Sequence, residues 1–346
     1  MKKLFNRSSF LAMLFALGIA LHSMAQQTMT VMEVDTRPYQ QVIDEVYEKI
    51  KDMSGGKNAD YIPELALVDS TLFGIALITV NGDVYTAGDF EDRVSIQSIS
   101  KVFTLAKVIE EQGARSIMDK IGVDATGLKF NSIIAIELRQ GEEINPLVNP
   151  GAIAATSLIA GNTYDEKWNN ITTTFNKFAG TELLVNEPVY KSEAATNQRN
   201  QAIAYLLNAY ERMYYDPAEA TDIYTKQCAL NVNSMELATM ASTLANGGIN
   251  PVTKEKVVSP ETVAFTLSVM ATAGLYDNSG QWLYATGLPG KSGVGGGIIA
   301  VDPGKFGIAV IGPKLDEAGN SVKAQYAIYE IVKALDGNPY LITPVK

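Results

Sequence analysis

Residues 95–103, SIQSISKVF, begin an apolar segment and carry three hydroxyls and one amine. On a helix, Ser98 and Lys101 are three residues apart and therefore share one face, about one turn from each other. This is the geometry that a serine nucleophile and a lysine base require. The same S-x-x-K pattern also arises by chance at an ordinary helix start, where Ser95 or Ser98 would cap free backbone N–H groups and Lys101 would face water. The rest of the chain has to decide between these interpretations.

The composition describes a globular protein with no sign of a nucleic-acid partner. Of the 346 residues, 47% are hydrophobic and 19% are charged, which is enough apolar material for a large core. The formal net charge is −10, whereas proteins that follow a phosphate backbone need clustered positive charge. No long stretch rich in lysine or arginine reverses that balance. We therefore expect no nucleic-acid partner.

Residues 1–25 have the pattern of a signal peptide. Basic residues precede a short apolar run over residues 10–21, and residues 23–25 (SMA) place small side chains where a signal peptidase reads them. The apolar run is shorter than the roughly 20 residues that span a bilayer, so a retained membrane anchor is the less favoured alternative. We expect cleavage after Ala25, export to the periplasm or the medium, and no stable membrane insertion afterwards. Residues 26–346 would then form a single catalytic domain.

The expected removal of this segment restricts the catalytic chemistry. The only histidine of the chain, His22, lies within it, so the mature protein would have no imidazole. This excludes a Ser-His-Asp triad, a Cys-His pair and a histidine-ligated metal, and we expect neither a metal nor another cofactor. The single cysteine, Cys228, cannot form an internal disulfide. Without a neighbouring imidazolium, we expect it to be a buried small residue rather than a nucleophile.

Hydrophobic periodicity predicts an α+β fold. Apolar residues at helical spacing predict a helix that Ser98 begins and Gly113 ends, and further helices over residues 39–53, 151–160, 198–214, 234–245 and 321–335. Apolar runs beside turn residues predict strands over residues 73–80, 84–87, 297–301 and 306–311. We expect one antiparallel sheet from the N- and C-terminal thirds (about residues 39–110 and 285–346), flanked by helices, with a helical region inserted over residues 111–284. The site would lie in the cleft between these two parts.

Four polar segments need a further explanation. Residues 145–151 (NPLVNPG) place two asparagines before a helix, where turn chemistry alone could account for them. In residues 190–201 (YKSEAATNQRNQ), a helix cap at Thr196 or Asn197 leaves an acid, an arginine and a further amide unexplained. Tyr224 is a core aromatic unless a cation lies beside it. Residues 287–297 (GLPGKSGVGGG) could present N–H groups to an anion, but Ala285 stands where the first glycine of a phosphate loop belongs.

Taken together, these segments resemble the serine-dependent glutaminases of the bacterial type, whose fold resembles that of serine β-lactamases and penicillin-binding proteins. The resemblance extends from about residue 39 to residue 339. It rests on the combination of residues 95–103, 130–133, 145–153, 192–193, 199–200, 227–228, 244–248, 276–277, 279–280 and 287–297. It implies hydrolysis of L-glutamine to L-glutamate and ammonia through a γ-glutamyl ester on the serine.

The resemblance implies a role for each matching residue. Ser98 matches the nucleophile and Lys101 the amine that takes its proton, so it favours the catalytic interpretation of the S-x-x-K pattern. Tyr224 matches the tyrosine that assists proton transfer to the departing ammonia. The backbone N–H of Val294, together with that of Ser98, matches the oxyanion hole. The positions that hold the amino-acid end of glutamine are matched by Asn149, Glu193, Asn200 and Tyr276.

These roles carry physical requirements. Glu193 can pair with the α-ammonium of the substrate. Lys101 can act as a base only if its pKa falls well below the ordinary value of about 10.4, through burial or through a second cation, for which Lys291 is a hypothesis. Pro150 stands where many family members have alanine, and it removes one N–H donor beside Asn149. We also expect a homo-oligomer, either a dimer or a tetramer.

Two alternative functions use the same residues. An exported serine β-lactamase or D-alanyl-D-alanine peptidase shares the S-x-x-K pattern, and residues 291–293 (KSG) resemble its third motif, but the chain has no Ser-Asp-Asn segment. A non-catalytic protein that binds an amino acid could keep the same pocket. The presence of Ser98, Lys101 and Tyr224 together argues against it, because a binding protein needs no nucleophile beside a base.

Overall fold

The computed structural model describes residues 38–142 and 144–342, and the expected signal peptide lies outside them. The residues described from Tyr39 onward form one compact unit. The strands are β1 (Gly74–Thr79), β2 (Val84–Gly88), β3 (Val94–Ser95), β4 (Asn231–Val232), β5 (Gly290–Ser292), β6 (Gly297–Asp302) and β7 (Phe306–Ile311). The helices of the first half are α2 (Tyr39–Ile50), α3 (Pro63–Ala66), the 3₁₀ helix η1 (Gln97–Ile99), α4 (Ser100–Gln112), α5 (Ala114–Lys120), α6 (Ile133–Arg139), α7 (Asn149–Leu158) and α8 (Tyr164–Ala179). Those of the second half are α9 (Glu187–Thr196), α10 (Gln198–Ala209), α11 (Pro217–Cys228), α12 (Ser234–Ala245), α13 (Pro260–Ala273), the 3₁₀ helix η2 (Tyr276–Asn278), α14 (Ser279–Thr286) and α15 (Val322–Ala334).

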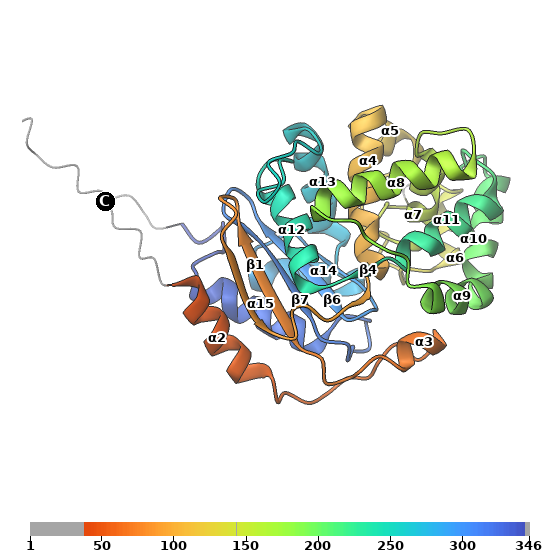
Figure 1. The fold of residues 1–346 in the computed structure, drawn as a ribbon. Helices are drawn as coiled ribbons and strands as arrows, with labels where there is room; N and C mark the ends of the chain where they lie inside the picture. The colour runs from red at the N-terminus through yellow and green to blue at the C-terminus, as the bar shows by residue number, and fades with distance from the viewer. Residues whose placement is uncertain (1–37, 143, 343–346) are drawn as a thin grey trace, which may run out of the picture. The chain divides into compact units, whose positions relative to one another are not determined.

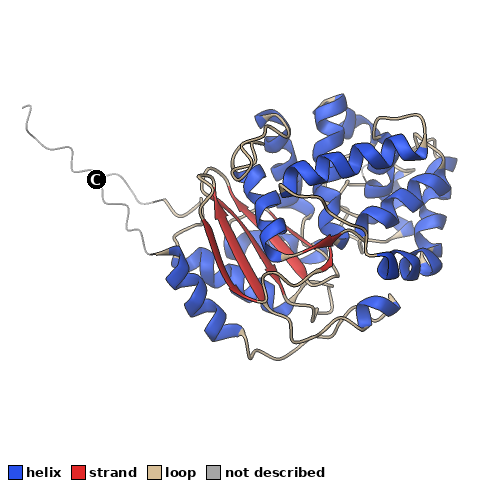
Figure 2. Cartoon of the chain, viewed as in Figure 1, coloured by secondary structure: helices blue, strands red, loops and turns tan. Residues whose placement is uncertain are grey.

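The main sheet joins the two ends of the described chain. Its strand order is β2-β1-β7-β6-β5, and every neighbouring pair is antiparallel. The pairing of β1 with β7 places Ile75 opposite Val310, more than two hundred residues later in the chain. Figure 2 shows these strands gathered in one sheet with helices around it. The predicted α+β class, with an antiparallel sheet from the N- and C-terminal thirds, is confirmed.

The sheet separates two hydrophobic cores because successive side chains of a strand point to opposite faces. Ile75 and Leu77 of β1 pack in the cluster that contains α2 and α15, whereas Ala76 and Ile78 pack in the larger cluster that contains α4 and α12. Figure 1 shows α2 and α15 along one face of the sheet and α12 against the other. Burial on both faces explains why β1 is apolar at every position except its last.

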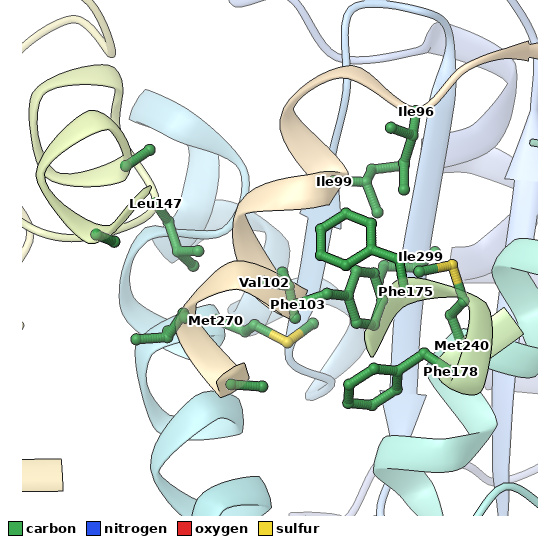
Figure 3. Close-up of a cluster of buried hydrophobic side chains, with 14 of the residues drawn as sticks. Ile96, Ile99, Val102, Phe103, Leu147, Phe175, Phe178, Met240, Met270 and Ile299 are labelled. Atoms are coloured by element: carbon green, nitrogen blue, oxygen red, sulfur yellow. The ribbon is translucent and has the colours of Figure 1, made fainter. Parts of the chain in front are cut away.

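Helix α4 directly follows η1 and passes through the larger hydrophobic core. Nine of its side chains are buried, among them Phe103, whose ring centroid lies 5.8 Å from that of Phe175 and 4.9 Å from that of Phe178. Figure 3 shows these three rings packed together beside Val102. The helix ends at Gly113, which has a φ of 80° that other residues rarely adopt.

Several predicted boundaries differ from the structure. Ser98 lies in η1, one turn before α4, and neither helix start has a side-chain cap. Residues 190–201 span the end of α9 and the start of α10, and α10 ends at Ala209, earlier than predicted. Strand β5 was not predicted, because Gly290-Lys291-Ser292 looks like part of a glycine-rich loop in the sequence. Among the described residues, the structure has no helix of a length and apolarity that would span a membrane.

We predict that Phe103→Ala lowers the free energy of unfolding by roughly 3–5 kcal/mol, because it removes a fully buried ring between two other rings. Urea denaturation followed by circular dichroism measures this change. Tyr284→Ala is the control: its side chain is 92% exposed, so its effect stays within about 0.5 kcal/mol. Equal losses in the two variants would contradict this account of the core.

Candidate active site

A cavity of about 330 Å³ lies where η1 meets the helices of the inserted region. It is lined by the predicted site residues Ser98, Asn149, Glu193, Asn200, Tyr224 and Val294. Its volume falls within the range typical of small-molecule sites. A larger cavity of about 470 Å³ lies between α14 and α15, but none of the predicted site residues lines it. The smaller cavity is therefore the candidate active site.

Ser98 and Lys101 are in direct contact. Lys101 Nζ donates a hydrogen bond to Ser98 Oγ over 3.0 Å and another to Asn149 Oδ1 over 2.7 Å. The contact arises because η1 continues into α4, so residues three apart are stacked by one turn. Ser98 is at the cavity wall, whereas Lys101 is 1% exposed and lies behind it. The alternative that Lys101 faces water is therefore wrong.

Lys101 is partly neutral because it is buried. Burial lowers the pKa of its ammonium to about 8, although Cys228 and Glu193 act in the opposite direction. A buried ammonium loses its hydration, and this favours the neutral amine. The sequence left burial and a second cation as possible causes, and the structure identifies burial as the main one. A substantial fraction of Lys101 is therefore neutral in mildly alkaline solution.

Lys291 is a second buried amine, and its hydrogen bonds go to main-chain oxygens. Its Nζ donates to the main-chain oxygens of Gly274, over 2.8 Å, and Ser292, over 2.7 Å, and lies 4.2 Å from the centroid of the Tyr276 ring. Burial, together with the charge of Lys101, holds the pKa of Lys291 well below its usual range. Lys291 therefore connects β5 to the segment before η2, and burial, rather than Lys291, is the largest cause of the lowered pKa of Lys101.

Asn149 connects Lys101 and Tyr224 to Asn200 through hydrogen bonds. Its Oδ1 accepts hydrogen bonds from Lys101 and, over 3.3 Å, from the hydroxyl of Tyr224. Its Nδ2 donates to Asn200 Oδ1 over 3.0 Å. Burial raises the pKa of Tyr224 well above its usual range, so the phenol stays protonated. Pro150 does not disturb this arrangement, since it lies in the first turn of α7, where backbone N–H groups have no helical partner.

Glu193 provides a buried carboxyl at the cavity wall. It is 8% exposed and accepts a hydrogen bond from Gln97 Nε2 over 3.3 Å. Burial raises the pKa of Glu193 to about 7, so the group ionises near neutral pH. Gln97 itself has a φ of 49°, a left-handed conformation that is uncommon for residues other than glycine. This turn directs the Gln97 amide to Glu193 and leaves the next residue, Ser98, at the cavity wall.

Two glycines bring Val294 close to the segment that contains Ser98. A Cβ atom on Gly295 would lie 2.3 Å from the main-chain oxygen of Ser95, and one on Gly293 would lie 2.7 Å from that of Ile96. Only glycine allows the two backbones to approach in this way. Val294, between the two glycines, lines the same cavity as Ser98. The glycine-rich segment therefore serves close backbone packing beside the serine.

Tyr276 lies beside the serine without lining the cavity itself. Its hydroxyl donates to the main-chain oxygen of Ser292 over 3.4 Å, and its ring lies 4.9 Å from that of Phe130, which does line the cavity. Burial raises the pKa of Tyr276 to about 12, although hydrogen bonds with Ser98 and Ser292 act in the opposite direction. The structure thus brings all eight predicted residues together, six at the wall and two directly behind it.

Sequence reasoning did not assign every residue of the cavity. The further lining residues include Tyr61, Gln97, Asn131, Asn197 and Arg199. Arg199 Nε donates to the main-chain oxygen of Asn131 over 2.8 Å, and both residues belong to segments that carry the family resemblance. Tyr61 gave no local signal, because it reaches the cavity, together with Ile62, from the segment before α3, which carries none of the motifs.

Two residues from the quoted segments are structural. Asn145 is fully buried; its Oδ1 accepts from the N–H of Leu147 over 2.9 Å, which is the turn chemistry that the sequence allowed, and its Nδ2 donates to the main-chain oxygens of Val123 and Asp124. Cys228 is buried and free, and burial raises its pKa to about 12, as expected for a thiol that is no nucleophile. Within residues 38–142 and 144–342, no cluster of histidine, cysteine and acidic side chains could hold a metal ion.

Comparisons with known proteins agree on one family. The sequence profile of the family "Glutaminase" matches residues 56–340. The glutaminase of Colwellia psychrerythraea is 54% identical over 299 residues, which cover 86% of this chain and 96% of the relative. Glutaminase 1 of Escherichia coli K12 is 47% identical over 307 residues, covering 89% and 99%.

Solved structures give the same result. A structure described as a probable glutaminase superposes with a TM-score of 0.86 at 47% identity and covers 88% of this chain and 98% of its own. A probable glutaminase from Bacillus subtilis, complexed with 6-diazo-5-oxo-L-norleucine, superposes with a TM-score of 0.77 at 27% identity and covers 87% and 96%.

The raised pKa of Glu193 predicts a pH-dependent cost to stability. Between the unfolded value of about 4.5 and the folded value of about 7, the folded state binds the proton more tightly, so stability falls as pH rises through this window. Glu193→Gln removes the effect, and at pH 8 it should be more stable than the unmodified protein by up to about 3 kcal/mol, with a smaller difference at pH 5.

Urea denaturation at the two pH values measures this difference. Glu236→Gln is the matched control, because Glu236 is also buried but pairs with Arg93 over 2.6 Å, so its removal should lower stability at both pH values. A Glu193→Gln variant that is no more stable than the unmodified protein at pH 8 would contradict the raised pKa of Glu193 in the folded state.

Proposed function

Because the chain belongs to the glutaminase family, it hydrolyses L-glutamine to L-glutamate and ammonia, and we propose that Ser98 is the nucleophile of this reaction. The observation that carries the proposal is the 3.0 Å contact between Ser98 Oγ and the buried amine of Lys101, whose pKa is lowered to about 8. A neutral amine beside a serine hydroxyl can accept its proton. The fold is of the glutaminase type, which resembles that of serine β-lactamases.

The first step is the attack of Ser98 on the side-chain amide. As the bond between Oγ and the amide carbon forms, the serine proton moves to Lys101 Nζ, and negative charge develops on the amide oxygen. The backbone N–H groups of Ser98 and Val294 would stabilise this charge, which the close packing of Gly293 and Gly295 against residues 95–96 supports.

The second step releases ammonia. The carbon–nitrogen bond breaks, and the departing nitrogen takes a proton from Tyr224, whose burial keeps the phenol protonated. The ammonium of Lys101 then gives a proton directly to the Tyr224 oxygen, and Asn149 Oδ1, which accepts hydrogen bonds from both groups, holds them close together. This leaves a γ-glutamyl ester on Ser98 and a neutral Lys101. Lys101 can then take a proton from the water that hydrolyses the ester and return it to Ser98 as glutamate leaves.

The remaining polar groups would hold the amino-acid end of glutamine. An ionised Glu193 can pair with the α-ammonium, and its pKa of about 7 allows this at and above neutral pH. Asn149 and Asn200 at the cavity wall, and Tyr276 behind it, add neutral hydrogen-bonding groups. The guanidinium of Arg199 also lines the cavity, and one acid together with one cation suits a zwitterionic substrate better than a purely anionic one. The β-lactamase or peptidase and non-catalytic alternatives find no support in the comparisons.

We further propose that the protein is exported after cleavage behind Ala25, as the residue pattern of 1–25 supports. N-terminal sequencing of the secreted or periplasmic protein tests this, and an intact Met1 would contradict it. We also propose a homo-oligomer, a dimer or a tetramer. Ile134 and Leu138, one turn apart on α6, are 61% and 72% exposed and could form part of its interface. Sedimentation velocity tests it, and a monomer at micromolar concentration would contradict it.

We predict that Ser98→Ala lowers ammonia release from L-glutamine by roughly 10³-fold or more, because it removes the atom that forms the ester. Ser100→Ala is the matched control: its Oγ lies 3.7 Å from the sulfur of Cys228, not beside Lys101, and it should retain most of the activity. Coupled detection of ammonia measures both variants, with a chromogenic β-lactam as a second substrate. Hydrolysis of the β-lactam without ammonia release from glutamine would contradict the proposed function.

A further inference from the structure

Outside the cavity, one carboxylate joins three helices. Asp222 of α11 accepts a hydrogen bond from the hydroxyl of Tyr190 on α9 over 2.8 Å and another from that of Tyr164 on α8 over 2.6 Å. Both contacts are partly buried, and bonds from a hydroxyl to a charged oxygen are among the stronger hydrogen bonds in proteins. Burial raises the pKa of Tyr190 to about 12 and that of Tyr164 above its usual range, so both phenols remain donors.

A basic side chain of the same helix packs on two aromatic rings of α8. Lys226, one turn after Asp222, places its Nζ 4.6 Å from the ring centroid of Trp168 and 5.6 Å from that of Tyr164. These cation–π contacts are a second connection between α11 and α8. The three helices are therefore connected by a cluster of which only Tyr190 belongs to a segment that the sequence analysis singled out.

The cluster lies next to residues of the active site along two of its helices. Asp222 is two residues before Tyr224 on α11, and Tyr190 is three residues before Glu193 on α9, so each is within about one turn of a site residue. Helix α9 is held on α11 at both ends: the N–H of Asn186 donates to the main-chain oxygen of Ala229 over 2.8 Å, and Asn197 Nδ2 donates to Thr225 Oγ1 over 3.0 Å. Between these ends, the bond from Tyr190 to Asp222 joins the middle of α9 to α11, one turn before Glu193, so its loss would let this part of α9 shift.

We propose that Asp222 and Tyr190 are positioning residues that set the distance between Glu193 and the Ser98–Lys101–Tyr224 group. The inference rests on the proposed function, in which Glu193 binds the α-ammonium of glutamine. Without the bond, α9 would move relative to α11, and the ammonium would bind less tightly while Ser98, Lys101 and Tyr224 keep their contacts through Asn149. Loss of the bond between Tyr190 and Asp222 would therefore raise KM and leave kcat nearly unchanged.

Two tyrosines on one carboxylate provide a matched experiment. Tyr190→Phe and Tyr164→Phe each remove one hydroxyl from Asp222, but only Tyr190 shares a helix with Glu193. For Tyr190→Phe we expect KM for L-glutamine to rise about fivefold, the effect of one lost hydrogen bond, with kcat within about twofold. For Tyr164→Phe we expect both constants to stay within about twofold. Thermal unfolding of both variants shows whether their loss of stability is similar.

Two further variants separate the possible outcomes. In a Glu193→Gln background, Tyr190→Phe should cause no additional rise in KM, because it acts through Glu193. Asp222→Asn, which offers one acceptor oxygen to two phenols, should also raise KM, and it serves if Tyr190→Phe does not fold. Equal effects of the two tyrosine variants, or additive effects in the Glu193→Gln background, would overturn the inference. If Glu193→Gln alone leaves KM unchanged, the binding role of Glu193 is wrong and the positioning inference is overturned with it.

Discussion

The burial of one amine is the constraint on which the rest of the site depends. Within the part of the chain that the structure describes, no opposite charge is in direct contact with Lys101; its nitrogen donates to Ser98 Oγ and Asn149 Oδ1, two neutral oxygens. A lysine in such a place gives up part of its charge because the ammonium cannot be hydrated. This costs folding stability, which the packing of α4 around Phe103 must offset. The result is an amine that can take a proton from serine without any histidine.

The fold assembles the site from segments that are distant in the chain. Strand pairing between β1 and β7 brings the C-terminal third beside the turn at residues 95–99, and the glycine-rich segment after β5 then lies against that turn. The inserted helices supply the opposite wall, where Asn149 begins α7 and Glu193 lies near the end of α9. Close packing of the turn at residues 95–99 against the glycine-rich segment fixes Ser98 at one wall of the cavity, and α9 carries Glu193 to the same cavity.

Local patterns in the sequence predicted the parts of this arrangement that local physics controls. The strands around residues 73–87 and 297–311 and the amphipathic helix at the start of the described chain follow from periodicity and turn residues. Strand β5 was missed because its glycine and its neighbours resemble a loop, and only pairing with β6 makes it a strand. The protonation state of Lys101 could not be predicted, because burial arises from tertiary packing. The hydrogen bonds of Tyr164 and Tyr190 with Asp222 could not be predicted for the same reason.

The central claim is that Lys101 is substantially neutral at the pH where the enzyme works, because it is buried beside Ser98. The most direct test is to titrate the side chain of Lys101 by NMR, with lysine labelled at Cε and Nζ and the Lys101 resonance assigned by its loss in Lys101→Arg. Burial beside Ser98 predicts a pKa of about 8 for this residue. A value near that of an ordinary lysine, about 10.4, would contradict it, since the amine would then be protonated and could not take the serine proton.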